Sequence, residues 1–404
     1  MALKLGVEGY APAVLRQIVD QGGRYAFGEA AQNLKKLAGL PISAQHVQRL
    51  TERIGRERAQ QRDRESDAFQ QNTLARGCAQ TAPVAAVMLD DGRAQTRQEP
   101  SGPGVLQPRW NAPKYGCFLT LDAKSSQSDP QPQPPAKYVD REATPKLVRE
   151  VQSLHGSAVS RDAKVASTPK RKRKRKRSSN LLLRTVIASL AGSDAFGAQV
   201  AVEVYKRGLD LAARKACVCD GQKSNWSVWE EHLKPLGFIP ILDFLHLLTY
   251  LYSAAQACGG PAQRCWERYV KWLTWAWQGE REKLLVALNA ACRDAGDAPK
   301  DAAETEPRAV LSKARTYVAN NIEKMDYPRY RKLGLPISSA PVESTIKQFN
   351  KRVKGTEKFW RPSALEAVLQ VRAAQLCQDN RDDCQWASPR PYRAARHTPL
   401  RKAA

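Results

Sequence analysis

Long apolar segments are scarce in this sequence of 404 residues. The longest, FIPILDFLHLLTYLY, is interrupted by Pro240, Asp243 and His246, whereas a membrane-spanning helix needs about 20 apolar residues. The opening segment, MALKLGVEGYAPAVLRQ, lacks the apolar core of a secretory signal peptide. We therefore expect a cytoplasmic protein without a membrane partner.

Paired cysteines are lacking as well. The nine cysteines form no Cys-x-x-Cys motif, and no histidines follow them at the spacing of a zinc site. This pattern excludes a zinc finger and predicts reduced thiols. Cys217 and Cys219 alternate along the chain, so we expect both side chains on one face of a strand.

Acidic residues are few relative to basic ones. The chain has 65 Lys and Arg against 40 Asp and Glu, which gives a formal net charge of +25. A charge this large predicts a polyanionic partner, and the lack of membrane segments favours double-stranded DNA over an anionic membrane. Hydrophobic residues make up 42% of the chain, enough for a sizeable core in two or three domains.

Residues 124–180 differ in composition from the rest of the chain. The segment SSQSDPQPQPP is rich in Pro, Gln and Ser and predicts an extended linker, whereas DREATPKLVREVQSL favours one helix. The run KRKRKRKR at 170–177 does not fold by itself, because its charges repel one another. It is either a localisation signal or a non-specific phosphate-binding arm.

Residues 25–58 have the pattern of two short helices joined by a turn. In the connecting AGLPIS, Gly39 suits a helix C-cap, Pro41 prevents continuation, and Ser43 suits the N-cap of the second helix. This order is typical of a helix-turn-helix. The second helix would expose side chains suited to base edges and phosphates, namely Gln45, His46, Gln48, Arg49 and Arg53. The alternative is a small helical hairpin with solvated charges.

Short apolar segments alternate with helical patterns in the rest of the chain. Buried strands are expected at 84–89, at 114–123 and in ACVCD, and an edge strand is expected in FIPILD because of Pro240. Residues 181–212 and 261–333 have helical patterns. Alternation of strands and helices predicts an α/β fold.

Three carboxylates stand out by their context. Asp90 and Asp220 end apolar strands, where α/β proteins gather ligand groups, and Glu343 begins a helix. Together they could bind two Mg²⁺ ions roughly 3.5–4 Å apart, as in phosphoryl transfer. The alternatives are ordinary: a strand-end Asp often caps a turn, and Glu343 could pair with Lys347 on the surface.

The helix that follows Glu343 has an apolar stripe made of Val342, Ile346, Phe349 and Val353. At about 100° per residue, Glu343 lies at the border of this stripe, at the head of a polar and basic row. This placement suits a metal ligand beside the core. We expect phosphate contacts from the lysines of the same helix, Lys347, Lys351 and Lys354.

Four segments resemble bacterial insertion-sequence transposases of the DDE type: VMLDDGRAQTR, ACVCDGQKSNWSVWEEHL, ILDFLHLLTYL and APVESTIKQFNKRVKGTEKFW. The resemblance covers most of residues 25–378, without the basic insert at 168–177. It implies a ribonuclease H-like mixed sheet flanked by helices, with Asp90, Asp220 and Glu343 as the catalytic triad. The first motif of the family usually reads Asp-Gly-Gly-Arg after a hydrophobic residue, and here Asp91 replaces the first glycine. We favour Asp90 as the metal ligand because it directly follows the apolar strand.

The resemblance also implies an activity. Two Mg²⁺ ions, or Mn²⁺ as a substitute, would serve cleavage at the terminal inverted repeats of an insertion sequence and strand transfer to target DNA by a homo-oligomer. Asp243 and His246 form a D-x-x-H motif that occurs in related transposases; the pair either supports the site or is structural. A Trp-rich segment either packs in the core or stacks on bases, and its residues are Trp266, Trp272, Trp275 and Trp277.

These features divide the chain into a helix-turn-helix-like region at 1–60, a connector at 61–82, a catalytic domain in pieces at 83–123, 181–260 and 336–378, a linker at 124–180, an all-helical insertion at 261–335, and a basic tail at 379–404. Two other functions remain open. One is a structure-selective nuclease on the same fold, which would cleave DNA without joining it. The other is a non-catalytic DNA-binding protein derived from a transposase.

Overall fold

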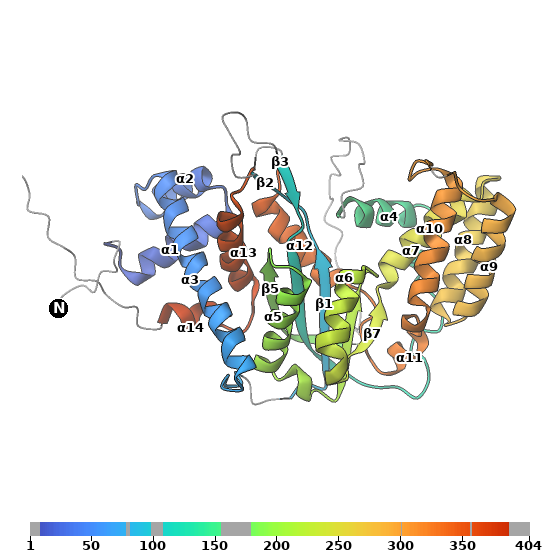
Figure 1. Ribbon diagram of the computed structural model, residues 1–404, viewed down its shortest axis with the longest axis horizontal. Helices are drawn as coiled ribbons and strands as arrows, with labels where there is room; N and C mark the ends of the chain where they lie inside the picture. The colour runs from blue at the N-terminus through green and yellow to red at the C-terminus, as the bar shows by residue number, and fades with distance from the viewer. Residues whose placement is uncertain are drawn as a thin grey trace, which may run out of the picture.

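The computed structural model describes residues 9–77, 81–97, 108–154, 179–299, 301–355 and 358–387. It has three parts along its longest axis (Figure 1): an N-terminal group of helices, a central sheet with helices on both faces, and a second group of helices. The basic run at 170–177 lies outside the described residues. In the described residues, no helix is long and apolar enough to cross a membrane.

The central sheet has five strands, in the order β5-β4-β1-β6-β7. β1 pairs with β4 and β4 with β5 in antiparallel fashion, whereas β6 lies parallel to both β1 and β7. The predicted α/β class is therefore confirmed, and Pro240 lies in an edge strand, as expected. The strands are β1 (Val84–Asp91), β4 (Lys114–Ala123), β5 (Ser179–Ser189), β6 (Arg214–Cys219) and β7 (Ile239–Leu242).

The predicted helix at 181–212 is wrong for its first part. β5 occupies Ser179–Ser189, and only the following α5 (Ser193–Lys206) is helical. The three leucines at 181–183 fit either structure, because a short apolar run has no decisive period. The β-branched residues Thr185, Val186 and Ile187 pair with β4 across the sheet, and this pairing decides for the strand.

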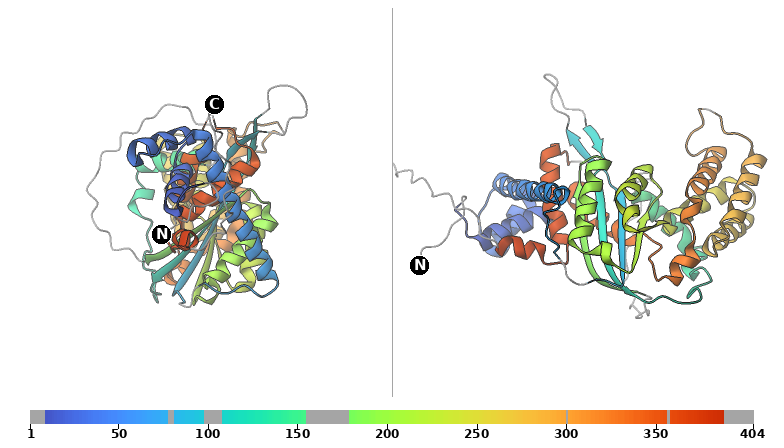
Figure 2. Two further views of the ribbon diagram at one scale, coloured as in Figure 1. Left: turned by 90° about the vertical axis from the view of Figure 1, so that its left-hand side faces the viewer. Right: turned by 60° about the horizontal axis from the view of Figure 1, so that its bottom comes forward.

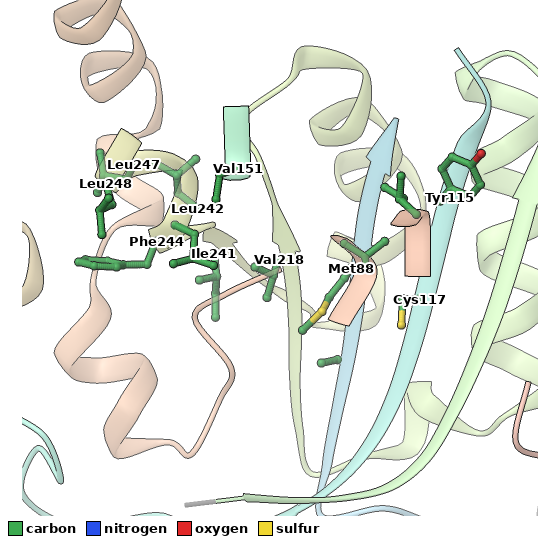
Figure 3. Close-up of a cluster of buried hydrophobic side chains, with 14 of the residues drawn as sticks. Met88, Tyr115, Cys117, Val151, Val218, Ile241, Leu242, Phe244, Leu247 and Leu248 are labelled. Atoms are coloured by element: carbon green, nitrogen blue, oxygen red, sulfur yellow. The ribbon is translucent and has the colours of Figure 1, made fainter. Parts of the chain in front are cut away.

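The two faces of the sheet support separate cores. Ala86 and Met88 of β1 belong to the larger cluster, together with residues of α7 (Phe244–Ala257), α12 (Ala340–Val353) and α13 (Pro362–Leu376). Figure 3 shows part of this cluster, which runs from Tyr115 and Met88 to Ile241 and Phe244.

The smaller cluster lies on the opposite face, between the sheet and α5 and α6 (Lys223–Val228). Its β1 members are Ala85, Val87 and Leu89. Cys217 and Cys219 also belong to it, with their Sγ atoms 3.6 Å apart, so the prediction that both lie on one strand face is confirmed.

Three helices form the N-terminal region: α1 (Pro12–Arg24), α2 (Phe27–Ala38) and α3 (Ala44–Gln70). The expected pair of helices is present, but α1 precedes it and α3 is longer than predicted. The caps are as expected, with Gly39 left-handed at the end of α2 and the Ser43 hydroxyl accepting from the His46 amide. A Cβ atom at Gly55 would lie 2.1 Å from the Ala367 carbonyl oxygen, so glycine permits the close packing of α3 on α13.

The second group of helices confirms the all-helical prediction for 261–333 in the described residues. With α7, it comprises α8 (Ala262–Trp277), α9 (Arg281–Ala295), α10 (Pro307–Asn321) and α11 (Tyr327–Lys332). Trp272 and Trp277 are buried, whereas Trp266 and Trp275 are half-buried against the same core. Core packing accounts for this tryptophan-rich segment.

The Pro-rich segment expected to be a linker lies against these helices. Arg331 donates from Nε to Asp129 at 2.8 Å, and the Trp277 indole donates to the Gln131 carbonyl at 2.8 Å. Tyr138 then packs against Phe244, and the predicted helix follows as α4 (Ala143–Leu154). The composition predicted a linker because the segment has no periodicity, but its contacts come from distant residues.

Part of the tail expected at 379–404 also folds. α14 (Arg381–Ala387) lies beside α1 and α13, and Asp382 and Asp383 form ion pairs with Arg58 and Arg16. A two-stranded hairpin, β2 (Ala94–Arg97) and β3 (Pro108–Asn111), projects beyond the sheet (Figures 1 and 2). The sequence patterns predicted neither element.

Candidate active site

Asp90 and Asp220 lie side by side at the carboxyl ends of two neighbouring parallel strands. Leu89 pairs with Cys219 in the β1–β6 ladder, and each aspartate is the next residue of its strand. Both are buried, with 1% and 7% of their surface exposed. Burial and then the charge of Asp220 raise the pKa of Asp90 well above its ordinary value. Burial and the neighbouring carboxylate thus both disfavour the charged form of Asp90.

The turn after β6 holds Asp220 in place. Its Oδ1 atom accepts hydrogen bonds from the Gln222 amide and the Asn225 side chain, both at 3.1 Å. The Tyr317 hydroxyl donates to the Asp220 carbonyl at 2.7 Å. Gly221 has a φ of +95°, and a Cβ there would lie 2.7 Å from the Tyr317 ring. Asp220 thus does cap a turn, and the turn fixes its position.

Asp91 lies on the other face of the sheet from Asp90, because successive side chains of a strand alternate. Its cross-strand partner in β4 is Lys114, whose ammonium lies 3.2 Å from the Asp91 carboxylate. Asp90 instead shares the face of Met88, which α7 and α12 cover. The additional acid in the DDG motif is therefore paired with a lysine on the opposite face, although burial and the charge of Asp220 still contribute to raising its pKa.

Glu343 lies in the first turn of α12 with only 6% of its surface exposed. The Ser339 hydroxyl donates to its Oε1 atom at 3.1 Å. Burial, followed by the charge of Asp243, raises the pKa of Glu343. The apolar stripe of the helix is buried as expected. The alternative expectation of a surface ion pair between Glu343 and Lys347 is wrong, because the Lys347 ammonium instead lies 2.5 Å from the carboxylate of Glu150 in α4.

Asp243 and His246 join the start of α7 to the start of α12. Asp243 is the N-cap of α7 and accepts from the amides of Leu245 and His246. It also accepts from the Ser339 amide at 2.9 Å, and the His246 Nδ1 atom lies 2.6 Å from its Oδ2. All of these contacts lie at the starts of α7 and α12. They favour the interpretation that Asp243 and His246 are a structural pair.

His246 is the positive group among the acids. Burial alone would lower its pKa, but the hydrogen bond to Asp243 and the charges of Asp243, Asp220 and Asp90 raise the pKa to about 10. Burial opposes ionisation of Asp243, yet the contacts with His246 leave its pKa lowered. At neutral pH the site therefore contains an imidazolium.

The acids form two groups around this histidine. Ligand atoms of Asp243, His246 and Glu343 all lie within 4.8 Å of one another. Asp90 and Asp220 form the other group, and the charge of His246 acts on the carboxylates of both groups. In the structure, Asp90 therefore lies next to Asp220. Glu343 lies next to His246 and is not in direct contact with the two aspartates.

The donor set fits a divalent cation that prefers oxygen. Asp90, Asp220 and Glu343 offer carboxylate oxygens, the ligands favoured by Mg²⁺. A cation between two buried carboxylates would relieve their repulsion. Asp243 is less suited to a ligand role, because it already accepts bonds from two helix termini and from His246.

The residues expected to bind DNA lie in two places. Gln45, Gln48 and Arg49 are exposed on the first turns of α3, and Gln48 donates to Glu52 at 2.7 Å. Arg53 is half-buried, with its Nε atom 3.6 Å from Glu57, so it is less available than predicted. On α12, Lys351 is exposed and Lys354 is half-buried.

Several residues that position the acids were not predicted from the sequence. Asn225, Ser339 and Tyr317 hold Asp220 and Glu343 but belong to three separate elements. Ser339 carried a usable signal, because a serine before Pro341 is typical of a helix start. The other two carried none, since their role depends on contacts between distant segments. No protein-family model matches the sequence, and a search of curated proteins found no matching relative.

Proposed function

We propose that this protein is a DNA transposase that cleaves the ends of an insertion sequence and joins the released 3′-hydroxyl to target DNA. One observation carries the proposal: Asp90, Asp220 and Glu343, far apart in the chain, are all buried around one histidine at the carboxyl edge of a sheet. Ligand and catalytic groups of open α/β sheets gather at that edge.

The sheet supports the same proposal. β1 lies at its centre, and of the other four strands only β4 runs antiparallel to it. A mixed sheet of this kind is what the resemblance to ribonuclease H-like transposases implies. Lys114 pairs with Asp91 on the opposite face and offsets part of its charge, although that charge still contributes to the raised pKa of Asp90. This pairing argues against a decayed copy.

Two Mg²⁺ ions, or Mn²⁺ in their place, would when bound activate a water or a 3′-hydroxyl and stabilise the leaving oxygen. Asp90, Asp220 and Glu343 are the residues that would hold them. Asp243 and His246 fix the start of α12 and thereby the position of Glu343. Their burial limits the access of bulk water to the acids.

DNA recognition would fall to the N-terminal helices. Gln45, Gln48 and Arg49 on α3 are the residues exposed for base and phosphate contacts. Lys351 and Lys354 at the end of α12 would bind phosphates nearer the acids. Because two element ends must react together, we expect a homo-oligomer, in the simplest case a dimer.

The decisive test is strand transfer with the purified full-length chain. The substrate is a labelled duplex from the DNA that flanks the coding sequence, supplied both intact and cut at the 3′ end, with a supercoiled plasmid as target and Mg²⁺ present. We expect cleavage of the first substrate and joining of the second. Cleavage without joining would indicate the nuclease, and a mobility shift without either product would indicate a DNA-binding protein.

A further inference from the structure

The β2–β3 hairpin continues the β1–β4 ladder past the acids. After the pair Asp91 and Lys114, the Gly92 amide donates to the Pro113 carbonyl at 2.8 Å, and Ala94 then pairs with Asn111. Two residues separate the end of β1 from the start of β2, and the hairpin projects from the acid-bearing edge of the sheet (Figures 1 and 2).

A third segment widens the hairpin. The Trp360 amide donates to the Gln95 carbonyl at 3.0 Å, and the Arg97 amide donates to the Trp360 carbonyl at 2.8 Å. Trp360 thus lies along β2 in parallel orientation, bridged to Thr96. Residues after α12 and residues after β1 form one small sheet.

One face of this small sheet is buried along β2 and at Trp360. Ala94, Thr96 and Trp360 have 0%, 1% and 8% of their surface exposed, and the Trp360 indole donates to the Val353 carbonyl at the end of α12. Because side chains alternate along a strand, the neighbours of these residues point outward. The outward face therefore carries Arg93 just before β2, Gln95 and Arg97 on β2, Trp110 opposite Gln95 on β3, and Phe359 and Arg361 beside Trp360.

The outward face is aromatic and basic. Trp110 is 52% exposed and Phe359 is 37% exposed. Arg93, Arg97 and Arg361 are exposed and form no ion pair with any carboxylate of the described residues. Asp91, the acidic residue at the base of the hairpin, forms an ion pair with Lys114. Exposed aromatic side chains that lie beside unpaired guanidinium groups suit an interaction surface for an anionic partner.

We propose that this face binds an unpaired DNA strand beside the scissile phosphate, with one base stacked on Trp110 and with Arg93, Arg97 and Arg361 on the phosphates. Every base has a π-face, so such binding tolerates any sequence. The guanidinium groups supply the charge complementarity that a polyanion needs. The placement next to the reacting phosphate rests on the proposed function, whereas the binding itself does not.

The spacing agrees with this placement. Gln95, the cross-strand partner of Trp110, lies five positions beyond Asp90, which is about 17 Å along an extended strand. That length is the span of a few nucleotides of an unpaired strand, whose phosphates lie farther apart than the roughly 3.4 Å rise of a stacked duplex. The outward face lies on the opposite side of the sheet from α12. A DNA strand that leaves the acids would therefore cross the edge of the sheet to reach this face.

The test measures DNA binding by fluorescence anisotropy in EDTA, where no cleavage takes place. The probes are a labelled blunt duplex and the same duplex with a single-stranded thymidine tail. For Trp110→Ala we expect affinity for the tailed probe to fall at least about fivefold, the order of one base–aromatic stack, with the blunt probe little affected. Trp110→Phe should retain most of the affinity, and Trp110→Leu should not.

A charge variant completes the test. Arg97→Gln should lower the slope of log affinity against log salt by about 0.7 for the tailed probe, the value for one lost phosphate contact on a single strand. Arg264→Gln is the matched control, because Arg264 is exposed on α8 far from the hairpin and its loss changes the net charge equally. Its affinity and slope should match those of the wild type.

Three outcomes overturn the inference: unchanged binding of the tailed probe by Trp110→Ala, an equal loss on both probes, or full rescue by Trp110→Leu, which would indicate apolar docking of another partner. Thermal unfolding of each variant checks that the fold is intact. If the wild type neither cleaves nor joins DNA but Trp110→Ala still loses the tailed probe, the transposase proposal fails and this inference stands.

Discussion

Arg352, near the end of α12, donates a hydrogen bond from Nε to the Gly22 carbonyl of α1 at 2.9 Å. Its guanidinium lies over the rings of Phe27 and Trp360, 4.5 and 5.0 Å from their centroids. Only 2% of its surface is exposed. The helix that carries Glu343 in its first turn is thus joined at its other end to the N-terminal helices and to the hairpin segment.

This contact should matter for stability. Removing the side chain in Arg352→Ala leaves a cavity and an unsatisfied carbonyl, so we expect unfolding to become easier by about 3 kcal/mol. Arg352→Lys should recover little, because an ammonium does not reproduce the planar stack. Chemical denaturation measures both, with the exposed neighbour substitution Lys351→Ala as a control that should change little. A loss no larger than that of the control would mean the junction carries no stability.

The acids should be required for chemistry. Asp90→Asn, Asp220→Asn and Glu343→Gln should each lower Mg²⁺-dependent cleavage by roughly a thousandfold, since metal-assisted stabilisation is worth several kcal/mol. Asp91→Asn is the matched control, because Asp91 faces Lys114 on the other side of the sheet. Gel assays of end cleavage give the rates. Retained cleavage in Asp90→Asn together with loss in Asp91→Asn would reverse the assignment of the two aspartates.

Metal binding should be visible without activity. A divalent cation that binds only the folded protein stabilises it by mass action, so Mg²⁺ or Mn²⁺ should raise the midpoint of thermal unfolding of the wild type. The rise should disappear in Asp220→Asn and Glu343→Gln. Differential scanning fluorimetry measures the midpoint with the added cation and, for comparison, in samples treated with EDTA. A rise that persists in both variants would place the cation elsewhere.

Acid should weaken the docking of α14. Burial alone would raise the pKa of Glu203, but the charge and hydrogen bonds of Arg381 outweigh it and lower the pKa to about 2. A lowered pKa contributes stability that is present above the ordinary value of 4.5 and is lost as pH falls toward 2. At pH 7, Glu203→Gln should cost about 3 kcal/mol of unfolding free energy, and the difference from wild type should shrink steadily below pH 4.5. A difference independent of pH would exclude the ion pair as its cause.

Sequence preference should depend on the exposed face of α3. Gln48→Ala and Arg49→Ala should each lower discrimination between the element end and random DNA by about 1–3 kcal/mol, while non-specific, salt-sensitive binding persists. Point variants are needed here, because deleting the region would expose the core that it shares with Val371 of α13. Competition mobility-shift assays measure the ratio. Equal preference in wild type and both variants would remove the helix-turn-helix interpretation.

Local patterns in the sequence were sufficient for the elements whose signals are local. The alternation and apolar runs of β1 and β4 predicted buried strands, and Gly39 and Ser43 marked the ends of two helices, because capping and pleating act over a few residues. The position of Asp90 and Asp220 at strand ends followed from the same signals.

Long-range contacts decided the rest. Pairing with β4 makes residues 179–189 a strand, although their leucines also suit a helix. Lys114 of β4 forms an ion pair with Asp91 on the face of the sheet opposite to Asp90. Lys347 forms its ion pair with Glu150 of α4 and not with Glu343. His246 lies between two groups of acids because the start of α7 lies beside the end of β6, where the Asp243 amide donates to the Cys219 carbonyl. Each of these features depends on which distant segment packs alongside, and local residue patterns do not specify which segments pack together.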